Sequence, residues 1–141
     1  MRIETRVQTK GPFFDPYAPQ VLKQAVENAT RELVQIGESI IVNKMTTGPR
    51  GVFLSVAQAR KGQASSGHYF RHINTKFDNL KGFIDDQNVI YGPWLEGSST
   101  RNETTRFKGY ATFRKTTQEL QKKSRNVFDA HLRRFANRMN R

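Results

Sequence analysis

The sequence predicts an α+β fold in which two long helices pack on a small antiparallel sheet, with a long flexible loop between the first helix and the sheet. Two observations lead to this prediction. Apolar residues recur at spacings of three and four over residues 19–44 and again over residues 110–138, as on one face of a helix. Between these segments, two short aromatic-rich runs are bounded by turn residues, as strands are. The length of 141 residues fits a single domain, 1–141.

The first elements are a short strand and a long helix. Residues 2–9 alternate between two kinds of side chain, which predicts a half-buried strand that ends at Gly11-Pro12. From Pro19 the period becomes helical, and this apolar stripe continues to about Lys44. A Gly-Pro pair follows shortly afterwards and ends the helix.

Residues 46–68 show no period and are punctuated by four glycines and a proline. No Asp or Glu occurs between Glu38 and Asp78, so this long loop is basic. We expect its cations to contact a polyanion or a DNA channel, and these are Arg50, Arg60 and Lys61. A connection of this length inside a small domain is often functional or mobile.

Two strands are predicted next, over residues 69–77 and 83–91, with Asp78-Asn79 and Gly82 as turn residues between them. The antiparallel pair that they form would be the sheet. Residues 92–109 then read as a second irregular stretch, and residues 110–138 as a basic amphipathic helix.

The composition favours binding over catalysis. The formal charge is +12, and cysteine is absent, which excludes a disulfide framework, a thiol nucleophile and a cysteine-based zinc site. No apolar run is long enough to span a membrane, and residues 1–10 lack the apolar centre of a signal peptide. With 35% hydrophobic residues, the core should be thin and completed against neighbouring subunits.

A search for catalytic or metal-binding patterns finds none of the spacings that such chemistry needs. His68 and His72 precede or lie in a predicted strand, where they would be about 13 Å apart. Asp85 and Asp86 are adjacent and point apart, so they are better explained as turn residues than as an acid/base dyad. We therefore expect no enzyme activity, no metal and no cofactor.

The second helix has two interpretations. From Phe113 to Arg141 the chain has nine Lys or Arg and two acids. The side chains could contact nucleic-acid phosphates, or they could form a solvated face with cations favoured near the helix C-terminus. The candidate contacts are Lys122, Lys123, Arg125, Arg133 and Arg134. The Trp94 side chain likewise could cap the core or anchor an interface.

One stretch resembles a known family. The run Tyr91, Trp94, Leu95, Glu96, Gly97 is followed by Ser98 to Tyr110, which reads SSTRNETTRFKGY. It resembles a segment of the small tail-component family of long-tailed bacteriophages, the head–tail joining or tail-completion proteins. The close similarity covers about residues 84–125, and the remainder matches in layout.

The resemblance implies a virion structural protein of the head–tail connector, or neck, made in the host cytoplasm and assembled at the capsid–tail junction. Such proteins form homo-oligomeric rings, commonly of about six or twelve subunits, between other connector and tail-tube proteins. Genomic DNA passes through the ring without sequence-specific contacts. The residues expected at the subunit interface are Trp94, Leu95, Glu96, Arg101, Thr105, Arg106 and Phe107. The alternative is a free, sequence-nonspecific nucleic-acid-binding protein.

Overall fold

The computed structural model describes residues 16–46 and 67–140. The strand expected over residues 2–9 lies outside the described residues. The long basic loop expected over residues 46–68 lies outside them as well, apart from its ends.

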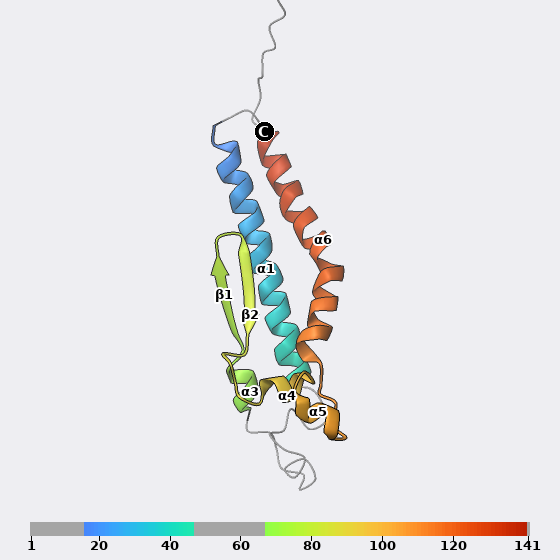
Figure 1. The fold of residues 1–141 in the computed structure, drawn as a ribbon. Coiled ribbons are helices and arrows are strands. Elements are labelled where there is room, and N and C mark those ends of the chain that lie inside the picture. Colours follow the sequence, from blue (N-terminus) through green and yellow to red (C-terminus); the bar gives the residue numbers. More distant parts are fainter. Residues whose placement is uncertain (1–15, 47–66, 141) are drawn as a thin grey trace, which may run out of the picture.

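Two long helices run side by side along the molecule and in opposite directions (Figure 1). Helix α1 spans Ala18–Thr46 and helix α6 spans Thr112–Met139, close to the ranges predicted from the apolar spacing. The backbone amides of Gln20 and Val21 donate to the carbonyl of Tyr17, which starts α1. Because the helices are antiparallel, the first turns of α1 lie beside the last turns of α6 (Figure 1).

A two-stranded antiparallel hairpin lies along α1, on the side opposite α6 in this view (Figure 1). Strand β1 spans Asn74–Asp78 and pairs with strand β2, Lys81–Asp85, in a register that places Lys76 opposite Phe83. The fold class is therefore α+β, with two long helices and one small antiparallel sheet, as the sequence predicts.

Gly37 explains how the hairpin and α6 both approach α1. A Cβ atom at this position would lie 2.6 Å from Ile84 Cδ1 on β2 and 2.9 Å from Leu120 Cδ1 on α6. The glycine interrupts the apolar stripe of the helix, and the space it leaves admits one side chain from each neighbour.

The apolar core lies at one end of the helix pair. Three short helices gather there, at the end where α1 finishes (Figure 1): α3 (His68–Arg71), α4 (Gly92–Glu96) and α5 (Thr100–Thr104). The buried cluster joins the last turns of α1 to these helices, and its members are Ile41, Met45, Tyr69, Ile73, Val89 and Leu95. Several large apolar side chains stay exposed, among them Leu80, Phe83 and Ile90.

Both predicted strands are partly wrong. Residues 68–71 are helical, so only the second half of the 69–77 run is extended. The second strand ends at Asp85, because the carboxylates of Asp85 and Asp86 accept hydrogen bonds from the backbone amides two residues further on, at 3.0 and 3.2 Å. These turns send the chain away from the sheet, and the interpretation of the two aspartates as turn residues is confirmed.

Candidate assembly module and basic groove

Residues 92–110 form a folded unit, here called the cap module, at the core end of the molecule. The prediction of an irregular stretch over residues 92–109 is wrong, because the segment contains α4 and α5. Pro93 occupies the first turn of α4, where its missing N–H has no consequence. Ser99 and Asn102 form a capping box that begins α5.

Glu96 connects the cap module to the long helix α6. Its two carboxylate oxygens accept hydrogen bonds from the backbone amides of Phe113 and Arg114, each at 3.0 Å. The residue at the N-cap of α6 is Ala111, which has no side-chain acceptor. The carboxylate of Glu96 therefore supplies from 15 residues upstream the cap that the local sequence lacks.

Asn102 holds the two halves of the cap module together. Its side chain is buried, with 4% of its surface exposed. The amide nitrogen donates to the carbonyls of Trp94 and Phe107 at 3.0 and 3.1 Å, and the amide oxygen accepts from the backbone of Ser99 at 3.1 Å. A buried amide with three partners fixes the path of the chain around it.

Two glycines permit a close approach of backbones inside the module. Gly97 and Gly109 have φ values of +94° and +88°, and a Cβ at Gly109 would overlap the backbone of Gly97. The Tyr110 amide donates to the Leu95 carbonyl at 2.7 Å next to this crossing. The positive φ values and the lack of space both require glycine.

An aromatic row completes the module. The ring centroids of Trp94 and Phe107 are 4.7 Å apart, and those of Phe107 and Tyr110 are 5.0 Å apart. All three side chains are half-buried. Trp94 therefore caps the core of its own chain, which is one of the two roles that the sequence left open.

The residues expected at a subunit interface divide into two groups. Leu95 is 2% exposed and lies in the core, and Glu96 caps α6, so the structure gives both of them a role within the chain. Arg101, Thr105 and Arg106 are exposed. The Thr105 hydroxyl is nevertheless engaged locally, since it donates to the Arg101 carbonyl at 2.8 Å. Lys108 of the module is exposed too, but its ammonium donates to the carbonyls of Asn102 and Glu103. The other exposed cations of the module are Arg101 and Arg106.

Ile90, two residues before α4, is the most exposed large apolar side chain of the described residues, at 97%. It borders a shallow depression of about 470 Å³ together with Pro93 of the module and Asp86 of the preceding turn. An isoleucine kept almost wholly in water gains by contact with an apolar surface.

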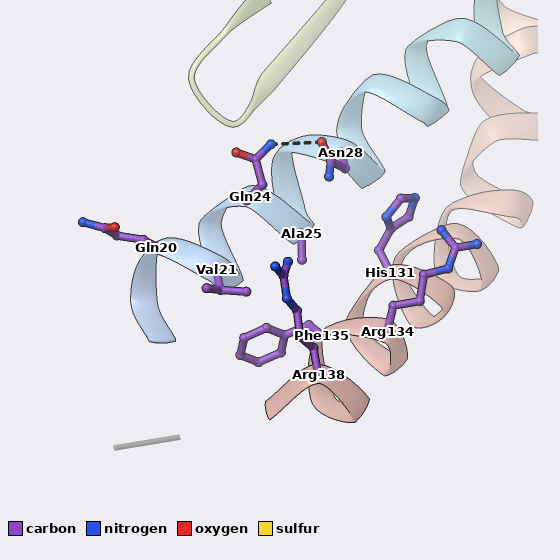
Figure 2. Close-up of a pocket in the computed structure, with 9 residues that line it drawn as sticks. All are labelled: Gln20, Val21, Gln24, Ala25, Asn28, His131, Arg134, Phe135 and Arg138. Carbon is purple, nitrogen blue, oxygen red and sulfur yellow. Dashed lines mark hydrogen bonds between the residues drawn. The ribbon is translucent and has the colours of Figure 1, made fainter. Parts of the chain in front are cut away.

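A second candidate site lies at the opposite end of the molecule, in a groove between the first turns of α1 and the last turns of α6 (Figure 2). Its volume is about 370 Å³. Val21, Ala25 and Phe135 supply its apolar part. The polar side chains that line it come from both helices, and they are Gln20, Gln24, Asn28, His131, Arg134 and Arg138.

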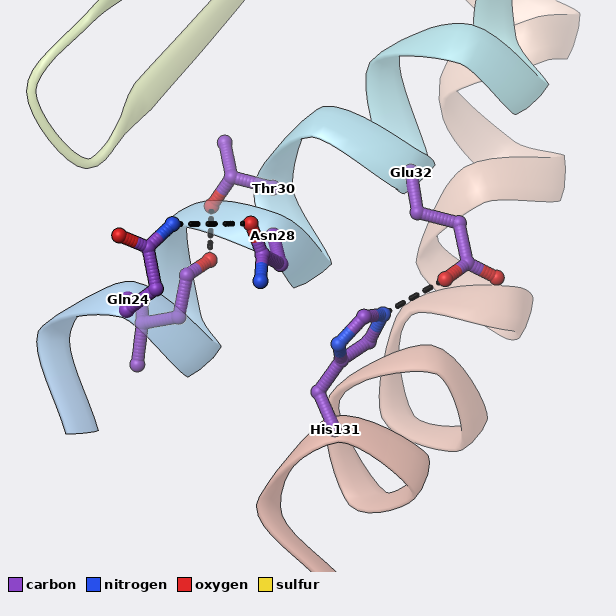
Figure 3. Close-up of polar contacts among 6 residues, drawn as sticks. Gln24, Asn28, Thr30, Glu32 and His131 are labelled. Carbon is purple, nitrogen blue, oxygen red and sulfur yellow. Dashed lines mark hydrogen bonds and ion pairs between the residues drawn. The ribbon is translucent and has the colours of Figure 1, made fainter. Parts of the chain in front are cut away.

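The groove contains no carboxylate among its lining residues. Glu32 of α1 lies close to the groove and is paired with His131 of α6. The atoms His131 Nε2 and Glu32 Oε2 are 2.6 Å apart (Figure 3). Gln24 donates to Asn28 at 3.1 Å along the α1 wall, as Figure 3 also shows. No ion pair involves Arg134 or Arg138 within residues 16–46 and 67–140.

Of the cations predicted to contact a polyanion, Arg134 lines this groove. Lys122, Arg125 and Arg133 lie on exposed parts of α6, and Arg125 is 3.9 Å from Asp129. Lys123 lines a different depression, beside Glu32. Arg50, Arg60 and Lys61 lie outside the described residues. The prediction missed the contributions of Arg138, His131 and the α1 amides.

The histidine pair of α3 also differs from expectation. His68 and His72 lie on one helical turn and its C-cap, and their rings stack with centroids 4.2 Å apart, so the expected separation of about 13 Å is wrong. His68 Nδ1 contacts the Tyr91 hydroxyl, and His72 Nδ1 lies 2.7 Å from the His68 carbonyl. Within the described part of the chain, no three His, Asp or Glu side chains are grouped as metal ligands would be.

Tyr69 is the most strongly perturbed ionisable group at this end. Burial, together with Asp86, which accepts its hydroxyl hydrogen bond at 3.1 Å, raises the pKa of the Tyr69 hydroxyl far above its usual value. Burial also raises the pKa of Tyr91. Both hydroxyls thus stay protonated at neutral pH, and the Tyr69 hydroxyl serves as a structural hydrogen-bond donor to Asp86.

Comparisons with protein-family models, with curated proteins and with solved structures find no match to this chain. None of the helices in residues 16–46 and 67–140 combines the length and the apolar character that a membrane span requires.

Proposed function

We propose that the protein is a structural component of the head–tail connector of a long-tailed bacteriophage, and that it assembles into a ring through which DNA passes. The observation that carries the proposal is the cap module. The stretch that resembles phage tail-completion proteins, Tyr91 to Tyr110, is a rigid unit held by Asn102 and by the Gly97–Gly109 crossing. It keeps Arg101 and Arg106 in solvent.

The distribution of exposed apolar side chains supports ring formation. Ring contacts are heterologous, so two different patches of the subunit must meet. Ile90 lies just before the cap module, whereas Leu80 and Phe83, 46% and 49% exposed, lie on the hairpin. We propose that Ile90 and the cap module of one subunit contact the hairpin of the next, with Ile90, Arg101 and Arg106 as the contacting side chains.

The assembly experiment measures the mass of the purified full chain by sedimentation and native mass spectrometry over a range of concentrations. Wild type should form a closed ring, of six or twelve subunits if the resemblance holds. Ile90→Asp should raise the concentration needed for assembly by about tenfold or more, because it places a charge in an apolar contact. Asn126→Asp, with the same charge change on an exposed part of α6, is the matched control and should assemble normally.

The competing function is a free nucleic-acid-binding protein, and the basic groove favours it equally. DNA affinity therefore does not separate the two functions, whereas size does. A chain that stays a monomer or dimer at every concentration and still binds duplex DNA would support the competitor and contradict the connector proposal.

Loss of assembly in infected cells gives a second readout. Electron microscopy of particles made with Trp94→Ala and Arg106→Ala together should show tailless heads and unjoined tails. Normal virions would contradict the assignment of the module to assembly.

A further inference from the structure

We infer that the groove between α1 and α6 is a phosphate-binding site through which the chain contacts the backbone of duplex DNA. The inference deepens the proposed function, on which it rests for the choice of DNA as the phosphate-bearing partner. It also predicts which end of the subunit faces DNA, since the groove lies at the end of the helix pair opposite the cap module (Figures 1 and 2).

The α6 wall supplies the charge. Arg134 and Arg138 are four residues apart, so they project from the same face of the helix about one turn apart. Both side chains are exposed and have no ion pair within the described residues, so neither must give up a carboxylate to bind a phosphate. A guanidinium fits a phosphate through two parallel hydrogen bonds.

The α1 wall supplies neutral donors. Gln20, Gln24 and Asn28 recur every four residues along α1 and line the groove, and in Figure 2 the side chains of Gln20 and Gln24 point away from α6. Amide groups of this kind commonly hydrogen-bond to phosphate oxygens in complexes with DNA. Gln24 already donates to Asn28, which aligns these two amides in the free protein (Figure 3).

The helix dipoles do not decide the sign of the ligand. The α1 N-terminus carries a partial positive charge and the α6 C-terminus a partial negative one, and the two ends lie side by side, so their effects largely cancel. The two guanidiniums then determine the local potential. Both acids of α1 near the groove have basic partners: Glu27 lies 3.9 Å from Lys23, and Glu32 is held by His131.

The chemistry of the groove suits a backbone contact and not base reading. The groove is open and lies in the seam between two helices that pack on each other, so it presents a concave surface to DNA and no protruding helix for the major groove. Contacts to phosphates position a protein on DNA without selecting a sequence. The site therefore fits a protein that surrounds DNA of any sequence.

The first test measures binding of a short mixed-sequence duplex by fluorescence anisotropy over a series of salt concentrations. Arg134→Gln with Arg138→Gln should weaken binding by about a hundredfold, about tenfold for each charge-assisted contact. The slope of log affinity against log salt should fall by about two. The matched control, Arg125→Gln with Arg133→Gln, removes the same charge from α6 outside the groove and should lose only a few-fold.

The second test approaches the site from the other wall. Gln20→Glu adds a carboxylate to the α1 lining of the groove and should weaken binding by about tenfold. Gln35→Glu adds the same charge to α1 at an exposed position outside this groove, and its affinity should stay close to wild type. Circular dichroism of each variant establishes that the helices are intact.

Three results would overturn the inference. Equal losses in the groove and control variants would mean that net charge, and no particular site, attracts DNA. Absence of duplex binding by wild type would exclude the contact altogether. Displacement of DNA by inorganic phosphate far beyond the effect of chloride at the same ionic strength would indicate a small-anion site instead.

The ring proposal is tested independently of the DNA-binding groove. The arginine variants keep Ile90, Arg101 and Arg106, so they should assemble as wild type does in sedimentation. A groove that binds DNA in a chain that never assembles would support this inference and contradict the ring.

Discussion

Replacement of Glu96 by alanine would remove the carboxylate that holds the first turn of α6. Both of its oxygens accept backbone hydrogen bonds, at 3.0 Å from Phe113 and 3.0 Å from Arg114. The N-cap position itself is occupied by Ala111 with φ +53°, which offers no acceptor. The first turn of the helix would therefore depend on water for these two amides.

The expected loss of stability is estimated from two roles of the Glu96 carboxylate, as a hydrogen-bond acceptor and as a negative charge at the helix N-terminus. Loss of an N-cap acceptor costs about 1 kcal/mol, and loss of a negative charge at a helix N-terminus costs about 0.3–1 kcal/mol. Because two amides are left without a partner, we expect about 2 kcal/mol for Glu96→Ala. Glu96→Gln retains one acceptor oxygen and should cost about half as much.

The free energy of unfolding is measured by urea denaturation followed by circular dichroism, with thermal unfolding as a second readout. A loss of about 2 kcal/mol corresponds to a midpoint lowered by roughly 6–8 °C for a chain of this size. Glu103→Gln, at an exposed position on α5, is the matched control and should change stability by less than about 0.5 kcal/mol. If Glu96→Ala costs no more than this control, the remote cap does not stabilise α6 and the reasoning is refuted.

Three further predictions concern the module and the helix pair. Asn102→Asp loses both donor bonds to buried carbonyls and should cost about 2–4 kcal/mol in urea denaturation; a cost below about 1 kcal/mol would contradict its central role. Gly109→Ala should cost about 3 kcal/mol, from its φ of +88° and its backbone overlap, and a neutral result would mean that the crossing is not rigid. The hydrogen bond from Lys44 lowers the pKa of Glu119 below its usual 4.5, so this contribution to stability is present above that value and is lost as pH falls through the folded pKa. Lys44→Met should return that pKa toward 4.5 in an NMR titration, and an unchanged pKa would exclude the pairing in solution.

The two long helices were predictable because their apolar stripes are long. Over more than 25 residues, spacings of three and four cannot be mistaken for alternation, and all four helix ends lie within two residues of the predicted ones. The location of the core at one end was not predictable. It depends on the short helices that cover Ile41 and Met45, and these helices have too few residues to show a period.

The strand predictions failed where the runs were short. Tyr69 and Phe70 both contact the core from a single helical turn, and over four residues such a turn looks like alternation. The later run Val89 to Tyr91 is apolar because it packs at the core end, although Ile90 points into solvent. The aspartates before it ended the strand, and greater weight on their turn chemistry would have placed the boundary correctly.

The candidate sites were predictable in part. Ser99 and Asn102 have the spacing of a capping box, although Asn102 stands where the usual sequence pattern has Glu or Gln. No local sequence pattern predicts that Glu96 caps α6, because its hydrogen-bond partners, Phe113 and Arg114, are 17 and 18 residues further along the chain. The groove depends on which face of α1 meets α6, and a basic stripe alone does not determine this.

The location of the chain in mature phage particles tests the connector proposal most directly. Cryo-electron microscopy of purified virions, combined with a count of copies per particle by quantitative mass spectrometry, measures both place and number. The account predicts a closed ring at the capsid–tail junction that surrounds the DNA, with six or twelve copies per particle. Absence of the chain from purified virions, or its presence at a site away from this junction, would contradict the account.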